Sequence, residues 1–235
     1  MTIRGKFISI EGIDGAGKTT FAQFLADTLQ THGIKSKAVS GTIHTDFSKN
    51  LVKLLLTEEE RKEKKRKEKK RKEHILSADV TAILFSALHL QTYQTRIKPL
   101  LDKGVWVIAD RFFDSTLAHH GYGNNNNTLI KNFFHLQQFA FQNASPDLTF
   151  LLTLPILCAQ TRIKERKEAN AFDKKSLSYF KRVQNGFLNI AKQETNRIKV
   201  VSNNSSIENT KKKLLKQLYL NYPQLLLNQN GKENS

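Results

Sequence analysis

The chain has 235 residues, of which 39% are hydrophobic, and its formal net charge at pH 7 is +17. This length can bury one sizeable core, no apolar run reaches the ~20 residues of a membrane-spanning helix, and no signal peptide fits before the first predicted strand at Lys6, so we expect a soluble, cytoplasmic protein. The single cysteine, Cys158, excludes an internal disulfide, and we expect it to pack within a helix rather than act as a nucleophile.

Short apolar runs alternate with helix-length periodic segments along the chain. The runs rich in Val, Ile, Leu and Phe predict strands at residues 6–10, 35–40, 105–109, 148–154 and 198–202. The periodic segments predict helices at residues 19–32, 46–56, 74–103, 128–143, 155–168, 175–195 and 206–220. This alternation predicts an α/β fold, a five-stranded parallel sheet with helices on both faces, in a single domain over residues 1–222 followed by a flexible tail at 223–235.

A phosphate-binding motif follows the first predicted strand. Gly12, Gly17, Lys18 and Thr19 have the spacing G-x-x-x-x-G-K-[ST] between a strand and a helix, which predicts a P-loop and the P-loop NTPase fold. The glycines let backbone N–H groups face the phosphates, Lys18 reaches the outer phosphates, and the Thr19 hydroxyl can ligate Mg²⁺. The predicted ATP-binding residues are Gly12, Ile13, Asp14, Gly15, Ala16, Gly17, Lys18, Thr19 and Thr20.

Much of the positive charge lies in one low-complexity segment. Residues 61–73, RKEKKRKEKKRKE, contain ten Lys or Arg and three Glu, so this run supplies +7 and leaves +10 for the rest of the chain. We expect a charged insertion at about residues 58–73, either a solvated helix extension or a disordered loop. A weak polyanion-binding patch and a nuclear-targeting signal are the alternatives.

Asp110 and Arg111 follow the predicted strand at 105–109. They lie at the carboxyl edge of the predicted sheet, where open parallel sheets bind their ligands. Taken alone, the pair is also typical of a salt bridge at a strand end, so its function depends on what else meets it there.

A basic helix face follows the fourth predicted strand. Arg162 and Arg166 are four residues apart, with two lysines beside them, so helical spacing places both arginines on one face. This face could close over ATP as a lid at about residues 160–175, and an ordinary solvated helix face is the alternative.

The order of three segments resembles the thymidylate kinase family, whose members transfer the γ-phosphoryl of ATP to dTMP. The segments are FISIEGIDGAGKTTFAQFLADTLQTHG, ILFSALHLQTYQTRIKPLLDKGVWVIADRFFDSTLAHHG and PDLTFLLTLP. The resemblance runs from about residue 5 to residue 220, apart from the charged insertion. It implies a nucleoside monophosphate kinase of dTDP and dTTP synthesis, Mg²⁺ accompanying ATP, and a homodimer formed through helices that include residues 77–98.

The resemblance also implies roles for single residues. Asp14 matches an acidic residue close to the reacting phosphates, Arg111 an arginine that grips the acceptor's phosphate, and Phe85 a phenylalanine that stacks on thymine. Physical chemistry supports these roles, because a guanidinium binds phosphate bidentately and an aromatic ring suits a flat base, although Phe85 could also be an ordinary core residue. The expected catalytic residues are Asp14, Lys18, Arg111, Arg162 and Arg166. The expected acceptor-binding residues are Phe85, His89, Asp110, Arg111, Ser115, Thr116 and His119, and the expected Mg²⁺ ligands are Thr19 and Asp14.

Several positions depart from the family's pattern. Residues 40–45, SGTIHT, stand where the family usually has Arg-Glu-Pro-Gly-Gly-Thr, and residues 170–173, NAFD, stand where its lid has Asp-Arg-x-Glu. His89 occupies the place of a thymine-contacting arginine, and His119 that of a tyrosine near the sugar. We therefore expect the donor side to be better preserved than the acceptor side.

Three functions are compatible with the sequence. The leading one is phosphorylation of dTMP by ATP. A related kinase for another nucleotide or nucleoside is the second, and a panel of acceptors separates it from the first. The third is a degenerate nucleotide-binding protein with a basic interaction surface, which would bind ATP without acceptor-dependent release of ADP.

Overall fold

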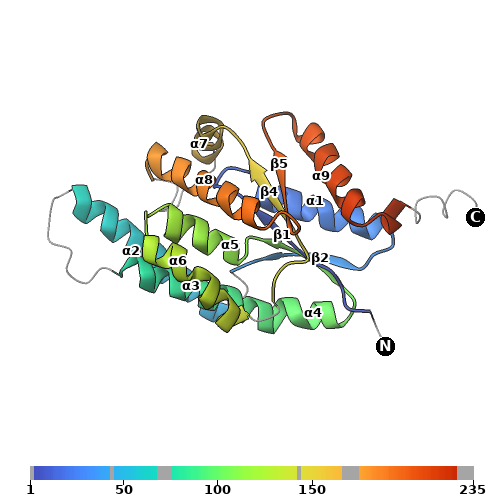
Figure 1. Cartoon of the computed structure of the whole chain (residues 1–235), viewed down its shortest axis with the longest axis horizontal. Helices are drawn as coiled ribbons and strands as arrows, with labels where there is room; N and C mark the ends of the chain where they lie inside the picture. The colour runs from blue at the N-terminus through green and yellow to red at the C-terminus, as the bar shows by residue number, and fades with distance from the viewer. Residues whose placement is uncertain (1–2, 43–44, 68–75, 142–143, 166–174, 227–235) are drawn as a thin grey trace, which may run out of the picture.

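The computed structural model describes residues 3–42, 45–67, 76–141, 144–165 and 175–226. It contains a sheet of five parallel strands in the spatial order β2-β3-β1-β4-β5 (Figure 1). The strands are β1 (Phe7–Glu11), β2 (Ser36–Ser40), β3 (Trp106–Asp110), β4 (Leu148–Thr153) and β5 (Ile198–Ser202). All five predicted strands are confirmed, each within one residue of its predicted ends.

Helices connect the strands and follow the last one. They are α1 (Lys18–Thr31), α2 (Asp46–Lys67), α3 (Ala78–Thr92), α4 (Lys98–Asp102), α5 (Phe113–Thr116), α6 (Asn127–Phe141), α7 (Ile156–Lys164), α8 (Leu177–Gln193) and α9 (Ile207–Asn221). Two further segments are π-helical, η1 (Tyr93–Ile97) and η2 (Leu117–Tyr122). Serine caps set three helix starts, because the hydroxyls of Ser77, Ser176 and Ser206 accept a hydrogen bond from a backbone N–H three residues later.

The two faces of the sheet carry different helices. Ile8 and Ile108 belong to a core that includes α1 and α9, whereas Phe7 and Val107 belong to a core that includes α3, α4 and α6. These neighbours in sequence point to opposite sides because strand side chains alternate. Helices on both faces, as predicted, therefore cover the sheet (Figure 1).

Four predictions about local structure need correction or extension. No element was predicted at residues 113–122, yet they are helical as α5 and η2. The helix predicted at 46–56 continues to Lys67, so the first part of the charged run extends a helix, and residues 68–75 lie outside the described residues. The helix predicted at 74–103 is described from Ala78 and contains the π-helical turn η1. Cys158 is exposed on α7, so its predicted packing role is wrong.

Strand register brings three loops to one edge of the sheet. Asp110 at the end of β3 is paired with Ile10 of β1 on one side and with Ser40 of β2 on the other. The loops that leave these three strands therefore start side by side, at the carboxyl edge where the sequence predicts ligands to bind. None of the described helices is both long and apolar enough to cross a bilayer.

Candidate active site

The P-loop wraps tightly between the end of β1 and the start of α1. Gly12 and Gly15 have φ values of 140° and 82°, and a Cβ at either position would lie 2.5 Å from a backbone oxygen, that of Leu152 or of Ala159. Only glycine fits both constraints. Because α1 begins at Lys18, the unpaired N–H groups of its first turn face the loop, which makes this helix start an anion-binding site.

Lys18 lies across the loop that it is predicted to serve. Its Nζ donates to the Ile13 carbonyl oxygen at 2.8 Å and lies 3.9 Å from Asp14 Oδ1. Burial lowers the pKa of Lys18 to about 8, with the positive charge of Arg111 adding to the effect. A bound phosphate would add negative charge beside this buried ammonium.

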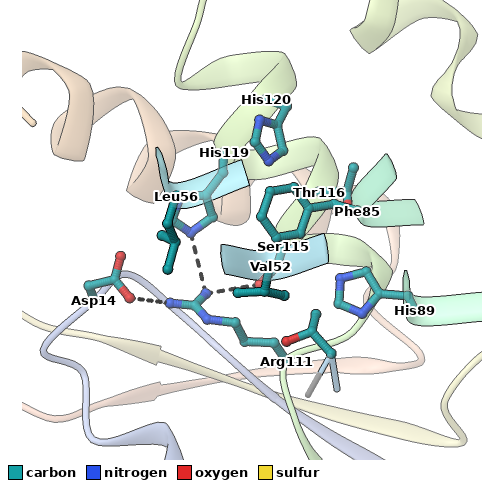
Figure 2. A pocket seen from close by; sticks show the side chains of 11 residues that line it. Asp14, Val52, Leu56, Phe85, His89, Arg111, Ser115, Thr116, His119 and His120 are labelled. Carbon is teal, nitrogen blue, oxygen red and sulfur yellow. Dashed lines mark hydrogen bonds and ion pairs between the residues drawn. The ribbon is translucent and has the colours of Figure 1, made fainter. Parts of the chain in front are cut away.

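Arg111 holds an unusual backbone conformation at the turn after β3. Its φ is 71°, in the left-handed region that non-glycine residues rarely adopt. The neighbouring loop is built around this turn, since a Cβ at Gly41 would lie 1.9 Å from the Arg111 carbonyl oxygen. From this turn the guanidinium points toward Asp14 of the P-loop (Figure 2).

The hydrogen bonds of the Arg111 guanidinium leave one edge open. Nη1 donates to Gly12 O at 3.2 Å, to Ser115 Oγ at 3.0 Å and to His119 Nε2 at 3.3 Å, and Nη2 is bonded to Asp14. Within the described part of the chain, the Nε hydrogen and one Nη2 hydrogen have no acceptor. These two donors form the fork with which an arginine binds a phosphate bidentately.

Asp14 links Arg111 to Lys18. Although burial alone would raise its pKa, the positive charges of Arg111 and Lys18 hold the pKa of Asp14 below its usual range, so this carboxylate is ionised. The P-loop lysine and the arginine of the β3 turn thus share one negative partner between them.

Glu11 supports the turn from beneath. It is buried, and its Oε1 accepts the Phe112 N–H at 2.7 Å while its Oε2 accepts the Ser115 hydroxyl at 2.6 Å. Burial and the nearby charge of Asp114 raise the pKa of Glu11 to about 8. Asp114 is itself paired with Arg197 through hydrogen bonds of 2.7 and 3.1 Å.

Beside Arg111 is a pocket of about 240 Å³ (Figure 2). It is lined by Asp14, Thr42, Val52, Leu56, Phe85, His89, Arg111, Ser115, Thr116, His119 and His120. Phe85 is half-buried and stacks on His120, with ring centroids 4.9 Å apart and planes 25° apart. A ring exposed to a pocket in this way is not an ordinary core residue, which was the alternative for Phe85.

Part of the pocket was missed by the sequence analysis. Val52 and Leu56 come from α2, and Thr42 and His120 were not among the predicted site residues. The four-residue spacing of Val52 and Leu56 on one helix face was the available signal. Nothing in the sequence alone indicated that this face would turn toward Arg111.

The predicted acceptor residues do not all lie in the pocket. Asp110 does not line it, and its Oδ2 instead accepts a hydrogen bond from the Thr19 hydroxyl on the donor side. The Thr116 hydroxyl is buried at the pocket with no hydrogen-bond partner among the described residues. His119 is occupied by protein groups, because Nε2 accepts from Arg111 while Nδ1 lies 3.3 Å from the Tyr179 hydroxyl. Burial and the charge of Arg111 hold the pKa of His119 well below its usual value.

The lid prediction is described only in part. Arg162 lies on α7, and its Nη1 is 3.5 Å from the Gly15 carbonyl oxygen, so this arginine reaches the P-loop. Arg166 and residues 170–173 lie outside the described residues.

Oxygen donors for a divalent cation lie beside the P-loop. The Thr19 hydroxyl and the Asp110 carboxylate are in contact, and Asp14 adds a second carboxylate nearby on the loop. Over the described residues no cluster of three or more His, Cys, Asp or Glu could hold a metal without a ligand's help. This set fits Mg²⁺, which is usually held by one or two carboxylates together with nucleotide phosphates.

Comparisons with known proteins point to one family. The family model described as "Thymidylate kinase" matches residues 10–214. A thymidylate kinase of Carboxydothermus hydrogenoformans is 36% identical over 197 residues, 83% of this chain and 89% of the relative. One of Buchnera aphidicola is 33% identical over 202 residues, 86% of this chain and 89% of the relative. The crystal structure of thymidylate kinase from Ehrlichia chaffeensis superposes with a TM-score of 0.65 at 25% identity, covering 92% of this chain and 98% of that one.

Proposed function

Because the chain belongs to the thymidylate kinase family, it is a nucleoside monophosphate kinase that makes dTDP from dTMP and ATP, and we propose that it does so with the P-loop on one side of Asp14 and the pocket on the other. Lys18 and the first turn of α1 bind the β- and γ-phosphates of ATP. The open edge of the Arg111 guanidinium binds the phosphate of dTMP, and Phe85 stacks on its base.

One observation carries this assignment above the others. Asp14 is bonded to Arg111 and lies 3.9 Å from Lys18, so the cations assigned to the acceptor and donor phosphates are held a single carboxylate apart. Phosphoryl transfer requires mainly that two phosphates meet in line while their charge is neutralised. A pair of cations fixed on either side of Asp14 provides both positioning and charge.

Further residues complete the donor side in this proposal. Arg162, which reaches the Gly15 carbonyl oxygen, adds positive charge over the P-loop, and we expect Arg166 to act with it. Thr19, Asp110 and Asp14 would hold Mg²⁺, which when bound neutralises the phosphates of ATP. The resting hydrogen bond between Thr19 and Asp110 keeps both oxygens together for that purpose.

The experiment is an acceptor panel with ATP and Mg²⁺, in which ADP release is measured with each common nucleoside monophosphate and with thymidine. We expect dTMP to be the best acceptor, dUMP to be used appreciably, and thymidine not to be used, because it lacks the phosphate that Arg111 binds. Equal use of purine monophosphates, or thymidine exceeding dTMP, would favour a related kinase with another acceptor.

We also propose a homodimer. Val80 and Ile83 on α3 and Phe134 on α6 are 41%, 54% and 56% exposed, and the two helices run beside each other (Figure 1). Apolar side chains gathered on neighbouring helices are typical of an interface. Sedimentation should give twice the chain mass, and Ile83→Glu should return the mass of one chain.

Polyanion binding by residues 61–73 stays a prediction, checked by salt-dependent retention on heparin.

A further inference from the structure

The His89 ring is fixed by two loops of the pocket. Its Nδ1 lies 3.0 Å from the Gly41 carbonyl oxygen, and the ring packs edge-on against Phe112, with centroids 5.6 Å apart and planes 68° apart. The Gly41 backbone is itself held, because its N–H donates to the Asp110 carbonyl oxygen at 2.9 Å. The imidazole is 1% exposed, so its orientation is determined by the protein before any ligand arrives.

These contacts also determine which ring nitrogen carries the hydrogen. A carbonyl oxygen can only accept, so the bond to Gly41 requires the hydrogen on Nδ1. Burial, reinforced by the positive charge of Arg111, lowers the pKa of His89 to about 3, so the ring gains no second hydrogen at neutral pH. Nε2 therefore carries no hydrogen and presents a lone pair, and no group among the described residues donates a hydrogen bond to it.

This arrangement reverses what a basic residue would offer at the same place. Figure 2 shows the His89 ring directed into the pocket from α3, the helix that also carries Phe85. An arginine there could only donate hydrogen bonds to a base, whereas His89 can only accept one. The resemblance places His89 where a thymine-contacting arginine stands, but the single N–H of this ring already donates to the Gly41 carbonyl oxygen.

We propose that His89 is a specificity-determining residue whose Nε2 accepts a hydrogen bond from the ring N3–H of the acceptor's pyrimidine. The proposal rests on the assignment of dTMP as the acceptor. Thymine and uracil both carry this hydrogen. Cytosine carries no hydrogen on N3. The lone pair of its N3 would face the lone pair of Nε2. A site built to pair with a substrate N–H rejects analogues that lack it, since its own buried polar atom is then left unpaired.

The test compares acceptors that differ at N3. The wild type should use dTMP at least about tenfold better, in kcat/KM, than either N3-methyl-dTMP or dCMP. In His89→Ala we expect kcat/KM for dTMP to fall about tenfold while that for N3-methyl-dTMP does not fall, so that the ratio between the two collapses. The dTMP to dUMP ratio should not change, because both bases keep N3–H. His135→Ala, which removes an exposed histidine of α6, is the matched control and should change none of these ratios.

A second variant and a spectroscopic measurement keep the test independent of folding and turnover. His89→Gln retains an acceptor and should keep part of the discrimination. In ¹⁵N spectra of histidine-labelled protein, the His89 Nε2 resonance should be that of an unprotonated nitrogen and should move on binding dTMP but not N3-methyl-dTMP. An unchanged dTMP to N3-methyl-dTMP ratio in His89→Ala, or hydrogen on Nε2, would overturn the proposal. A wild type that fails to phosphorylate dTMP would instead overturn the proposed function, and the nitrogen spectra would still test His89.

Discussion

The two sides proposed to bind ATP and the acceptor are built in opposite ways. The P-loop is one continuous segment whose backbone is its working part, fixed by glycines that nothing else can replace. The pocket proposed to bind the acceptor is lined by side chains from α2, α3, the turn after β3, α5 and η2, which come from distant parts of the chain. A binding site made of backbone tolerates little change, whereas one made of separate side chains can change one contact at a time, as His89 does.

The sharpest way to separate the two sides is Arg111→Ala. It removes the proposed acceptor-phosphate fork but leaves the P-loop sequence intact, so transfer to dTMP should fall by more than about 10²-fold while ATP still binds. Steady-state kinetics and calorimetric titration with ATP measure the two quantities. Arg182→Ala, which removes an arginine bonded to Gly123 away from the pocket, is the control and should leave transfer intact. Loss of ATP binding in Arg111→Ala would mean that the two sides are not separable.

Lys18→Ala tests the proposed donor side in the same way, by removing the cation expected to bind the phosphates of ATP. Turnover should fall by at least about 10²-fold, the scale of losing one preorganised electrostatic contact, and affinity for dTMP should stay within a few-fold of the wild type. Kinetics with saturating dTMP and direct dTMP titration check this. The control is Lys35→Ala, which removes an exposed lysine just before β2. Near-normal turnover in Lys18→Ala would remove the P-loop from the donor role.

Glu11 is buried beneath the turn that carries Arg111, and its ionisation should change the free energy of unfolding. Its folded pKa of about 8 is above the unfolded value of 4.5, so the stability that comes from the neutral carboxyl is fully present below about 4.5 and is lost as the pH rises through about 8. Glu11→Gln cannot ionise. The melting temperature of this variant relative to the wild type should therefore rise by several degrees between pH 5 and pH 8.5. Ser9→Ala, a buried polar change on the same strand, should show a constant difference.

The smallest effect is expected for changes in the charged segment at residues 61–73. Replacement of residues 61–73 by a short Gly/Ser linker should leave the melting temperature and the rate of dTMP phosphorylation nearly unchanged, because loop length changes stability only slowly. Thermal unfolding and kinetics check this. A substantial loss of folding would show that the end of α2 packs against the domain. If the segment binds polyanions, the replacement should abolish salt-sensitive retention on heparin.

The sequence predicts the sheet and the P-loop conformation well for a physical reason. Strands such as β3 and β4 are short runs rich in Val, Ile, Leu and Phe, which predict strands directly. The P-loop is predicted from the spacing of its residues because all of them are adjacent in the sequence. No helix was predicted at residues 113–122 because their sequence, FDSTLAHHGY, has no regular apolar period, and the π-helical turn shifts the face that each residue presents.

Side-chain assignments depended on tertiary contacts that no local pattern contains. Asp110 was grouped with the acceptor residues because it follows the strand predicted at 105–109, but at the end of β3 Asp110 bonds to Thr19 whereas Arg111 lines the pocket. The tautomer of His89 depends on the Gly41 carbonyl, 48 residues away along the chain. Such facts follow from which loops meet at the sheet edge, and the sequence alone does not contain that geometry.

The left-handed backbone at Arg111 places stability and catalysis in opposition at a single position. A glycine there would adopt φ 71° without strain, whereas arginine and alanine do not. An Arg111→Gly protein should therefore unfold at a higher temperature than Arg111→Ala, although both lose the guanidinium. The arginine at this position therefore lowers folding stability, and the proposed acceptor-binding role of its guanidinium is what would offset that loss.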